Sequence, residues 1–146
     1  MDNSMPELFS ETDPTMGVPL LVPRDDPRLN PAPIARLFAE RGEAAAEPVI
    51  GGAMDELSQR FLKAETFHRA CRFGDLARLT RSMVGVAEGI GFNGVAHAAS
   101  QVTDCALNRD ATALAATMAR LGRLTEQSLA AIWDLDPGHG GDETLR

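Results

Sequence analysis

The sequence predicts an all-α fold, an antiparallel up-down-up-down bundle of four helices, and three observations support this prediction. Apolar residues recur every three or four positions along four long stretches between residues 53 and 134. Very short polar or glycine-containing turns join these stretches, which favours antiparallel neighbours. The apolar content comes mainly from Ala, Leu, Val and Met, and no pattern typical of strands is present.

Shifts in composition divide the chain into four parts. Residues 1–32 form an acidic arm that we expect to be extended and flexible, and residues 33–52 form a short helix followed by a linker. We expect the four-helix bundle over residues 53–135 and a flexible glycine-rich tail over residues 136–146. Eight of the nine prolines lie in the first two parts, where they block regular structure. The apolar segment 18–22 is the exception in the arm and is a candidate to dock on the bundle.

A short extra helix is predicted over residues 33–46, ahead of the bundle. Pro33 suits the first helical position, and Glu47–Pro48 is expected to end the pattern. Gly42 weakens the second half of this helix. A small apolar face is formed by Ile34, Leu37 and Phe38. This helix is expected to cover one end of the bundle.

The first long helix is predicted over residues 53–73, after a break at Gly51–Gly52. Its apolar face consists of Met54, Leu57, Phe61, Ala64, His68 and Cys71. We expect Gly74 to end this helix and Asp75 to cap the next one.

The central helix is predicted over about residues 75–90, with one apolar and one polar face. At about 100° per residue, its apolar stripe contains Leu76, Leu79, Met83, Val86 and Ile90. Arg81 lies nearly opposite this stripe, so any chemistry that this helix carries is expected on the face around Arg81.

Two further helices complete the predicted bundle, over about residues 93–108 and 111–134. The expected inner residues are Val95, Ala99, Val102 and Ala106 in the first, and Leu114, Met118, Leu121, Leu124, Ser128 and Ile132 in the second. Asn93 and Asp110 are suitable N-terminal caps for the two helices.

The charge of the chain argues against general binding to nucleic acid or to anionic membranes, because the net charge is −7. Residues 1–50 contain nine acidic and four basic residues, whereas residues 60–81 contain six basic and two acidic residues. This imbalance suggests that the acidic arm covers the basic face of the helices in cis.

A cytoplasmic location is expected by default. No apolar run reaches the ~18 residues that a membrane span requires. The acidic N-terminus lacks the basic region of a signal peptide. The two cysteines, Cys71 and Cys105, lie in helical patterns and are expected to be reduced residues in or beside the core.

The sequence predicts no metal site, no cofactor and no enzymatic active site. The candidate metal ligands are His68, Cys71, His97, Cys105 and His139. His68 and Cys71 share a helical face, but nothing nearby completes a site of three or four converging ligands. No serine or cysteine has an identifiable base, and the glycines follow a helix rather than a strand, so they match no phosphate-binding loop.

The stretch 80–92, TRSMVGVAEGIGF, resembles the signature of histidine-containing phosphotransfer (HPt) domains. In that family the central helix carries His-x-Leu-Lys-Gly, then small residues and an Ile-Gly or Leu-Gly pair. Met83 matches the Leu, Gly85 the Gly, and Ile90-Gly91 the later pair. The resemblance covers roughly residues 53–134, and it implies the family's four-helix bundle and a place in a two-component phosphorelay.

Two departures from the family pattern concern the reacting group. Arg81 stands where the phospho-accepting His is expected, and Val84 stands where the Lys is expected. A guanidinium stays protonated and has no free lone pair, so it is not a nucleophile. The resemblance therefore implies the family's fold without its phosphotransfer, that is, a non-catalytic pseudo-phosphotransfer module.

The implied partners are a response-regulator receiver domain or a histidine kinase. The docking face that the resemblance implies consists of Arg78, Arg81, Val84, Gly85 and Glu88. Arg81 can enter the acidic pocket of a receiver as a fixed positive charge. Gly85 lies one turn from Arg81, and its missing side chain lets a partner approach the helix closely.

Two alternatives remain open at this point. In the first alternative, the chain is an active phosphotransfer protein that uses a displaced histidine. His97, which is expected to be exposed, is a better candidate for this histidine than His68, which is close to the core. Otherwise, the chain is a helical oligomerisation module whose Ala-rich faces pair with another helix. The sequence leaves the oligomeric state open.

Overall fold

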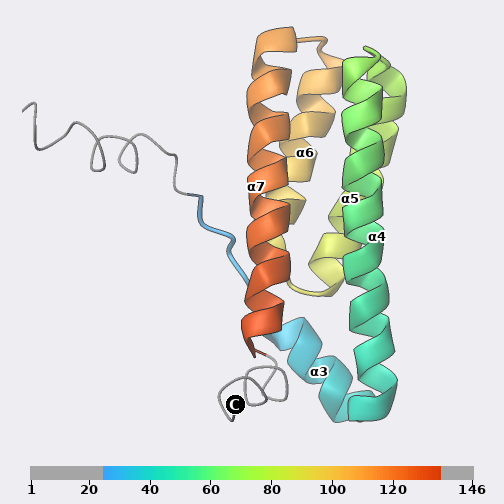
Figure 1. Ribbon diagram of the computed structural model, residues 1–146, viewed down its shortest axis with the longest axis vertical. Helices are drawn as coiled ribbons and strands as arrows, with labels where there is room; N and C mark the ends of the chain where they lie inside the picture. Colours follow the sequence, from blue (N-terminus) through green and yellow to red (C-terminus); the bar gives the residue numbers. More distant parts are fainter. Residues whose placement is uncertain (1–24, 136–146) are drawn as a thin grey trace, which may run out of the picture.

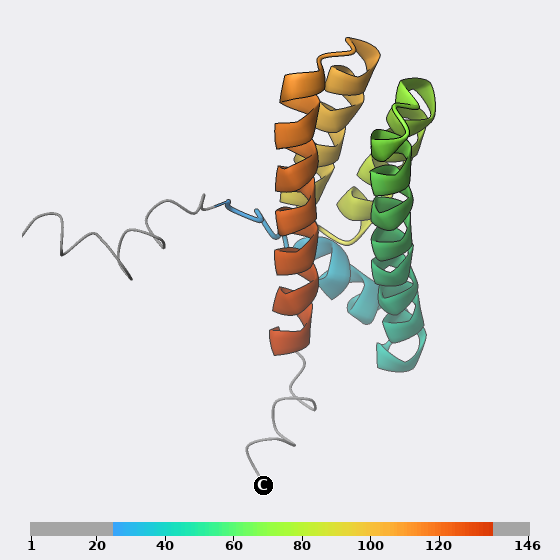
Figure 2. The ribbon, with the colours of Figure 1, turned by 45° about the horizontal axis from the view of Figure 1, so that its top comes forward.

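The computed structural model describes residues 25–135, which are folded into five α-helices without a named strand. The helices are α3 (Ala32–Arg41), α4 (Glu43–Arg69), α5 (Phe73–Gly89), α6 (Asn93–Leu107) and α7 (Ala111–Leu135). The four longer helices lie side by side, and the short α3 lies across one end of them (Figures 1 and 2). The predicted all-α class is confirmed.

One apolar core joins the four longer helices. Its fully buried large side chains include Leu57 of α4, Leu76 and Met83 of α5, and Leu114 and Leu121 of α7. Helix α6 is buried along much of its length through small residues, which allows the neighbouring helices to pack closely against it. Its buried residues are Gly94, Val95, Ala96, Ala98, Ala99, Val102, Thr103 and Ala106.

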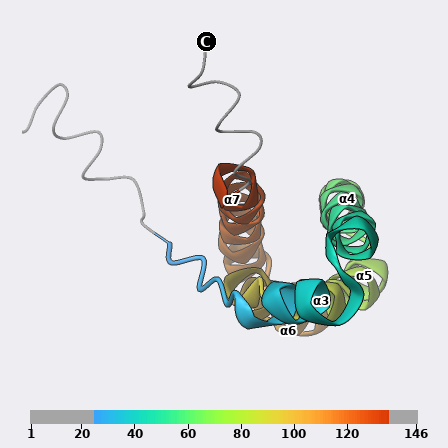
Figure 3. The same ribbon diagram turned by 90° about the horizontal axis from the view of Figure 1, so that it is seen from below.

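The four helices form an arc that is open on one side. Helix α5 packs most extensively against α6, and α6 packs against α7, whereas α4 and α7 make few contacts with each other. Seen along the helix axes, the helices follow the order α4, α5, α6, α7 around the arc (Figure 3). The side between α4 and α7 is therefore the least closed part of the bundle.

The spacing of apolar residues predicts both ends of α5, α6 and α7 to within two residues. The predicted apolar stripe of α5 also faces the core, since Leu76 and Met83 of α5 and Ile90 just after it are buried, and Leu79 and Val86 are half-buried. Asp110 caps α7 as expected, because its Oδ1 accepts a hydrogen bond from the backbone N–H of Ala113 at 3.2 Å.

The beginning of the bundle differs from the prediction. Helix α4 begins at Glu43, so residue 53 is not a boundary, and the expected linker within residues 33–52 is wrong. Neither the expected end at Glu47–Pro48 nor the expected break at Gly51–Gly52 occurs, because α4 runs through both. The chain turns instead at Gly42, whose φ of 81° favours glycine.

The surroundings of the first turns of α4 explain why the helix continues through Pro48 and Gly51–Gly52. Pro48 removes the N–H that would bond to the carbonyl of Ala44, but Ala44 is exposed, so water can satisfy that carbonyl. Ala46 and Ile50, in the same turns, are buried, and α3 packs against this helix. Tertiary burial therefore outweighs the local preference of proline and glycine for a break.

The turn between α4 and α5 also differs from the prediction. Gly74 does not end the first long helix, because α5 already begins at Phe73. The left-handed residue in this turn is Cys71, with a φ of 55°. Cys71 is exposed, so the expectation that it is a core residue is wrong. Cys105 is half-buried.

Residues 25–31, called the strap below, follow a defined path across α6 and α7. The Asn30 N–H donates to the carbonyl of Gly91 at 2.8 Å, and the Gly94 N–H donates to the carbonyl of Pro27 at 2.9 Å. For these residues the structure differs from the predicted flexible arm. Residues 1–24, with the segment 18–22, and the predicted tail 136–146 lie outside the described residues.

Two glycines make room for the strap. A Cβ at Gly91 would lie 1.9 Å from the carbonyl oxygen of Asn30, and one at Gly94 would lie 2.4 Å from that of Pro27. Gly91 also has a φ of 80°, which L-residues rarely adopt. The Ile90-Gly91 pair thus has a structural role in this chain, at the seam between the strap and the start of α6.

None of the described helices is both long enough and apolar enough to cross a membrane.

Candidate functional site

The residues of the predicted docking face lie along the outer side of α5. Arg78, Arg81, Gly85 and Glu88 are exposed, and Val84 is half-buried. This arrangement follows from the helical period, because the buried Leu76 and Met83 place the opposite side of α5 against the core.

Some of the arginines on and beside this face form ion pairs, and Arg81 does not form one with any described residue. Asp75, in the first turn of α5, binds both Arg72 and Arg78, each at 2.5 Å. Arg72 also lies over the ring of Phe67, 5.2 Å from its centroid. In the part of the chain that the structure describes, Arg81 has no ion pair or side-chain hydrogen bond, so no described residue occupies the N–H donors of its guanidinium.

A contact from α4 fixes the edge of this face beside Arg81. Arg60 donates to the hydroxyl of Ser82 at 2.8 Å and to the backbone carbonyl of Ser82 at 3.2 Å. Arg60 also forms an ion pair with Glu56 at 2.6 Å. This contact joins α4 to α5 at the level of Arg81.

Gly85 opens the same face to close approach. Apart from its chain neighbours and the backbone of its own helical turns, no atom of the described residues lies within 4 Å of the position that a Cβ at Gly85 would occupy. Gly85 therefore is not required for packing within the described residues, and a side chain at this position would point into open space. The expectation that Gly85 leaves room for a partner is compatible with this geometry.

A shallow groove adjoins Gly85 where α3, the first half of α4 and the end of α5 meet. Its volume is about 670 Å³. The residues that line it include Leu37 of α3, Val49 of α4, and Gly85, Val86 and Gly89 of α5. Val49 is 40% exposed, which is large for an apolar side chain on an inward-facing wall. The groove can accommodate an apolar side chain next to the charged face.

Sequence reasoning did not find this groove. Its α4 wall begins at Pro48, in a stretch that the sequence indicated as a break. The signal that could have located it is the set of small residues Gly52, Ala53, Gly85 and Gly89, which line it from two helices. Without a continuous α4, these residues could not be placed opposite each other.

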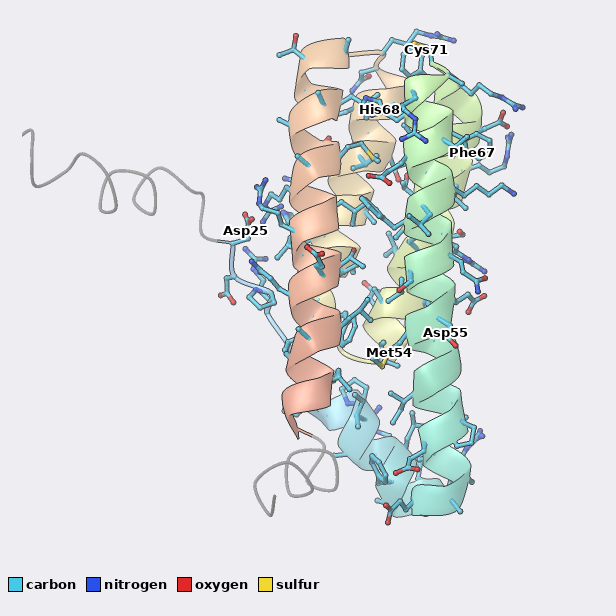
Figure 4. The ribbon with its side chains drawn as sticks, viewed as in Figure 1. Asp25, Met54, Asp55, Phe67, His68 and Cys71 are labelled. Carbon is cyan, nitrogen blue, oxygen red and sulfur yellow. The ribbon has the colours of Figure 1, made fainter. Side chains whose placement is uncertain are left out.

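The other candidate residues do not converge on a site. His97 is exposed on α6, and His68 is half-buried on α4, near the exposed Cys71 (Figure 4). Within residues 25–135 no group of three or more His, Cys, Asp or Glu side chains is placed to hold a metal ion. His139 lies outside the described residues.

The acidic arm does not cover the basic face of α5 in its described part, so this expectation is wrong for residues 25–31. Asp25 instead forms ion pairs with Arg123 at 2.7 Å and Arg120 at 3.2 Å, on α7 (Figure 4). The hydrogen bond from Arg123, with the charges of both arginines, lowers the pKa of Asp25 although burial opposes the shift. The strap thus leaves the face around Arg81 uncovered.

Comparison of the chain with protein-family models, with curated proteins and with solved structures gave no match.

Proposed function

We propose that this chain is an HPt-like phosphorelay module, an antiparallel up-down-up-down four-helix bundle that has lost the phospho-accepting histidine. In this proposal, the outer face of α5 docks a response-regulator receiver domain or a histidine kinase without transferring a phosphoryl group. The three-residue connections between successive long helices support the up-down-up-down order.

One observation carries the docking proposal. An exposed arginine without a partner among the described residues, Arg81, stands one turn from Gly85, which has open space around it. A charged side chain beside a bare stretch of helix is suited to a partner that brings both an anionic pocket and a close-packing surface. The apolar groove beside Gly85 would then receive an apolar side chain from the same partner.

The chemistry of Arg81 sets what docking can achieve. A guanidinium donates up to five N–H groups, and it pairs well with carboxylates or with a phosphoryl group held on one. It cannot accept a phosphoryl group, since it has no free lone pair. Docking would therefore occupy the acidic pocket of the partner and compete with a true phosphotransfer protein, which would lower the flux through the relay.

The test measures binding of the full chain to a panel of receiver domains and histidine kinases by calorimetry. Arg81→Glu is expected to weaken binding by at least about tenfold, because a like charge then faces the acidic pocket. The matched control is Arg41→Glu, which makes the same charge change at an exposed position at the end of α3. Absence of binding to every partner, or an equal effect of the two variants, would refute the docking proposal.

A second assay addresses the non-catalytic part of the proposal. The chain is incubated with phosphorylated receivers, and acid-labile label on the chain is measured. No label is expected. Label that appears on the wild type and disappears in His97→Ala would establish the displaced-histidine alternative instead. A stable oligomer whose mass Arg81→Glu leaves unchanged, combined with no receiver or kinase binding, would favour the oligomerisation module.

A further inference from the structure

The open side of the bundle, between α4 and α7, contains an apolar groove on a different face from Arg81. Its volume is about 620 Å³. Phe61 and Leu62 of α4 line one wall, and Met118 and Leu129 of α7 line the other. Leu62 is 62% exposed, the largest exposure among the large apolar side chains that the structure describes. The groove is therefore an apolar surface without a covering element in the described part of the chain.

One residue that lines this groove has a buried polar atom without a partner among the described residues. The ring of Phe61 lies against Gly122, where an added Cβ would come within 2.9 Å of the ring. This contact is the place where α4 and α7 come close. Nearby on α7, Thr125 lines the groove, and its buried hydroxyl has no hydrogen-bond partner among the described residues. Buried hydroxyls are usually paired, so the groove is suited to an occupant that brings a backbone donor or acceptor.

The strap leads from α6 toward this groove. The strap contacts the start of α6 at Gly94, and its first described residue, Asp25, contacts α7. Asp25 binds Arg123, and Arg123 is itself one of the residues that line the groove. Asp25, where the described part of the chain begins, therefore lies on the side of α7 away from α4, with α7 between it and the groove (Figures 3 and 4).

We propose that residues 18–22 of this same chain, VPLLV, occupy the groove between α4 and α7. These residues precede Asp25 by three to seven positions, a reach of roughly 10–23 Å at about 3.3 Å per extended residue. That distance is enough to pass over one helix, whose diameter is about 10 Å. The occupant is thus tethered one helix away from the groove, and tethering raises its effective concentration above that of a free partner.

The chemistry of the segment matches the groove. Val18, Leu20, Leu21 and Val22 are apolar, and no charged residue interrupts them. Pro19 and the following Pro23 disfavour a helix, so the segment keeps backbone N–H and C=O groups free to pair with the hydroxyl of Thr125. A second copy of the chain or a helix from another protein are the competing occupants, and the test separates them.

The experiment records methyl NMR spectra of the full-length chain. Intrachain contacts are expected between the methyl groups of Leu20 or Leu21 and those of Met118 or Leu129, at an intensity that does not change on dilution. The double variant L20D/L21D is expected to weaken docking by roughly a hundredfold, because two leucines lose their burial. The groove methyls, Leu62 included, should then shift to the positions of an open groove.

The matched control is Leu8→Asp, an apolar-to-acidic change in the arm outside the proposed segment. It should leave the groove signals unchanged. Contacts seen only between labelled and unlabelled copies would assign the groove to a second chain and overturn the proposal. Identical groove spectra for the wild type and L20D/L21D would also overturn it. Neither result depends on whether Arg81 binds a receiver.

Discussion

The attachment of the strap by Asp25 gives the most quantitative prediction. The side chain of Asp25 is 9% exposed, and its two oxygens accept separate hydrogen bonds from Arg120 and Arg123. We consider Asp25→Ala, which removes both bonds and leaves two arginines without their shared carboxylate. Arg120 keeps its bond to Gln101 at 2.9 Å, so most of the loss falls on Arg123.

The size of the effect follows from these contacts. A hydrogen bond to a charged group contributes about 1.5–3 kcal/mol. The two arginine side chains are 26% and 34% exposed, so solvent weakens the ion pairs toward the range of surface pairs, about 0–1 kcal/mol each. We therefore expect Asp25→Ala to lower the free energy of unfolding by about 2 kcal/mol.

Urea denaturation monitored by circular dichroism measures this change. Hydrogen exchange adds a local readout, since the amides of Asn30 and Gly94 bond across the seam between the strap and α6. Both amides should exchange faster in the variant. The control is Asp55→Ala, an exposed carboxylate on α4 that has no ion pair among the described residues. If Asp25→Ala matched this control in stability and in exchange, the strap would not depend on the ion pairs.

The pH dependence of the strap follows from the same group. The pKa of Asp25 in the folded chain lies below its ordinary value of 3.8, because Arg123 and Arg120 favour the carboxylate. Its contribution is therefore complete above pH 3.8 and is lost as the pH falls through the lowered pKa. In acid titrations, the difference in stability between the wild type and Asp25→Ala should disappear within this acidic window.

Three further predictions concern packing and the docking face. Gly91→Ala should lower stability by about 1–3 kcal/mol in thermal denaturation, because the φ of Gly91 is 80° and an added Cβ would meet the carbonyl of Asn30. The control Gly51→Ala, at a position with open space around it, should not lower stability. Thr80→Val should cost about 1 kcal/mol, because the buried hydroxyls of Thr80 and Thr103 lie 2.8 Å apart; in a double-mutant cycle, Thr103→Val should cost less once Thr80 is already Val. Gly85→Ala should stabilise α5 by about 0.5–1 kcal/mol in urea while it weakens receiver binding in calorimetry, and a gain in both would contradict the role given to Gly85.

The sequence was sufficient for the elements that local patterns define. Helices α5, α6 and α7 carry regular apolar stripes separated by short turns, so their positions and buried faces could be predicted. The exposure of Arg81 follows from its place opposite such a stripe. The start of α4 could not be predicted, because Pro48 and the pair Gly51–Gly52 resemble a break unless the packing of α3 is known.

Contacts between residues that lie far apart in the sequence could not be predicted either. The strap is proline-rich and resembles a solvated linker, and only the fold brings Asp25 to Arg123. Gly91 matched the family pattern and Gly94 had no assigned role, whereas the structure shows that the two glycines make room for Asn30 and Pro27. The turn at Cys71 could not be predicted, because glycine is the residue that normally adopts a left-handed conformation and the nearby Gly74 therefore indicated the turn instead.

The central claim is that the outer face of α5 is a docking surface. The most direct measurement is NMR mapping of the full chain during titration with a receiver domain that binds it. We predict that the amide signals of Arg78, Arg81, Gly85 and Glu88 shift first, together with those of the groove residues beside Gly85, while signals of α7 remain in place. Shifts confined to α7 or to the outer face of α6 around His97, with α5 unchanged, would contradict it.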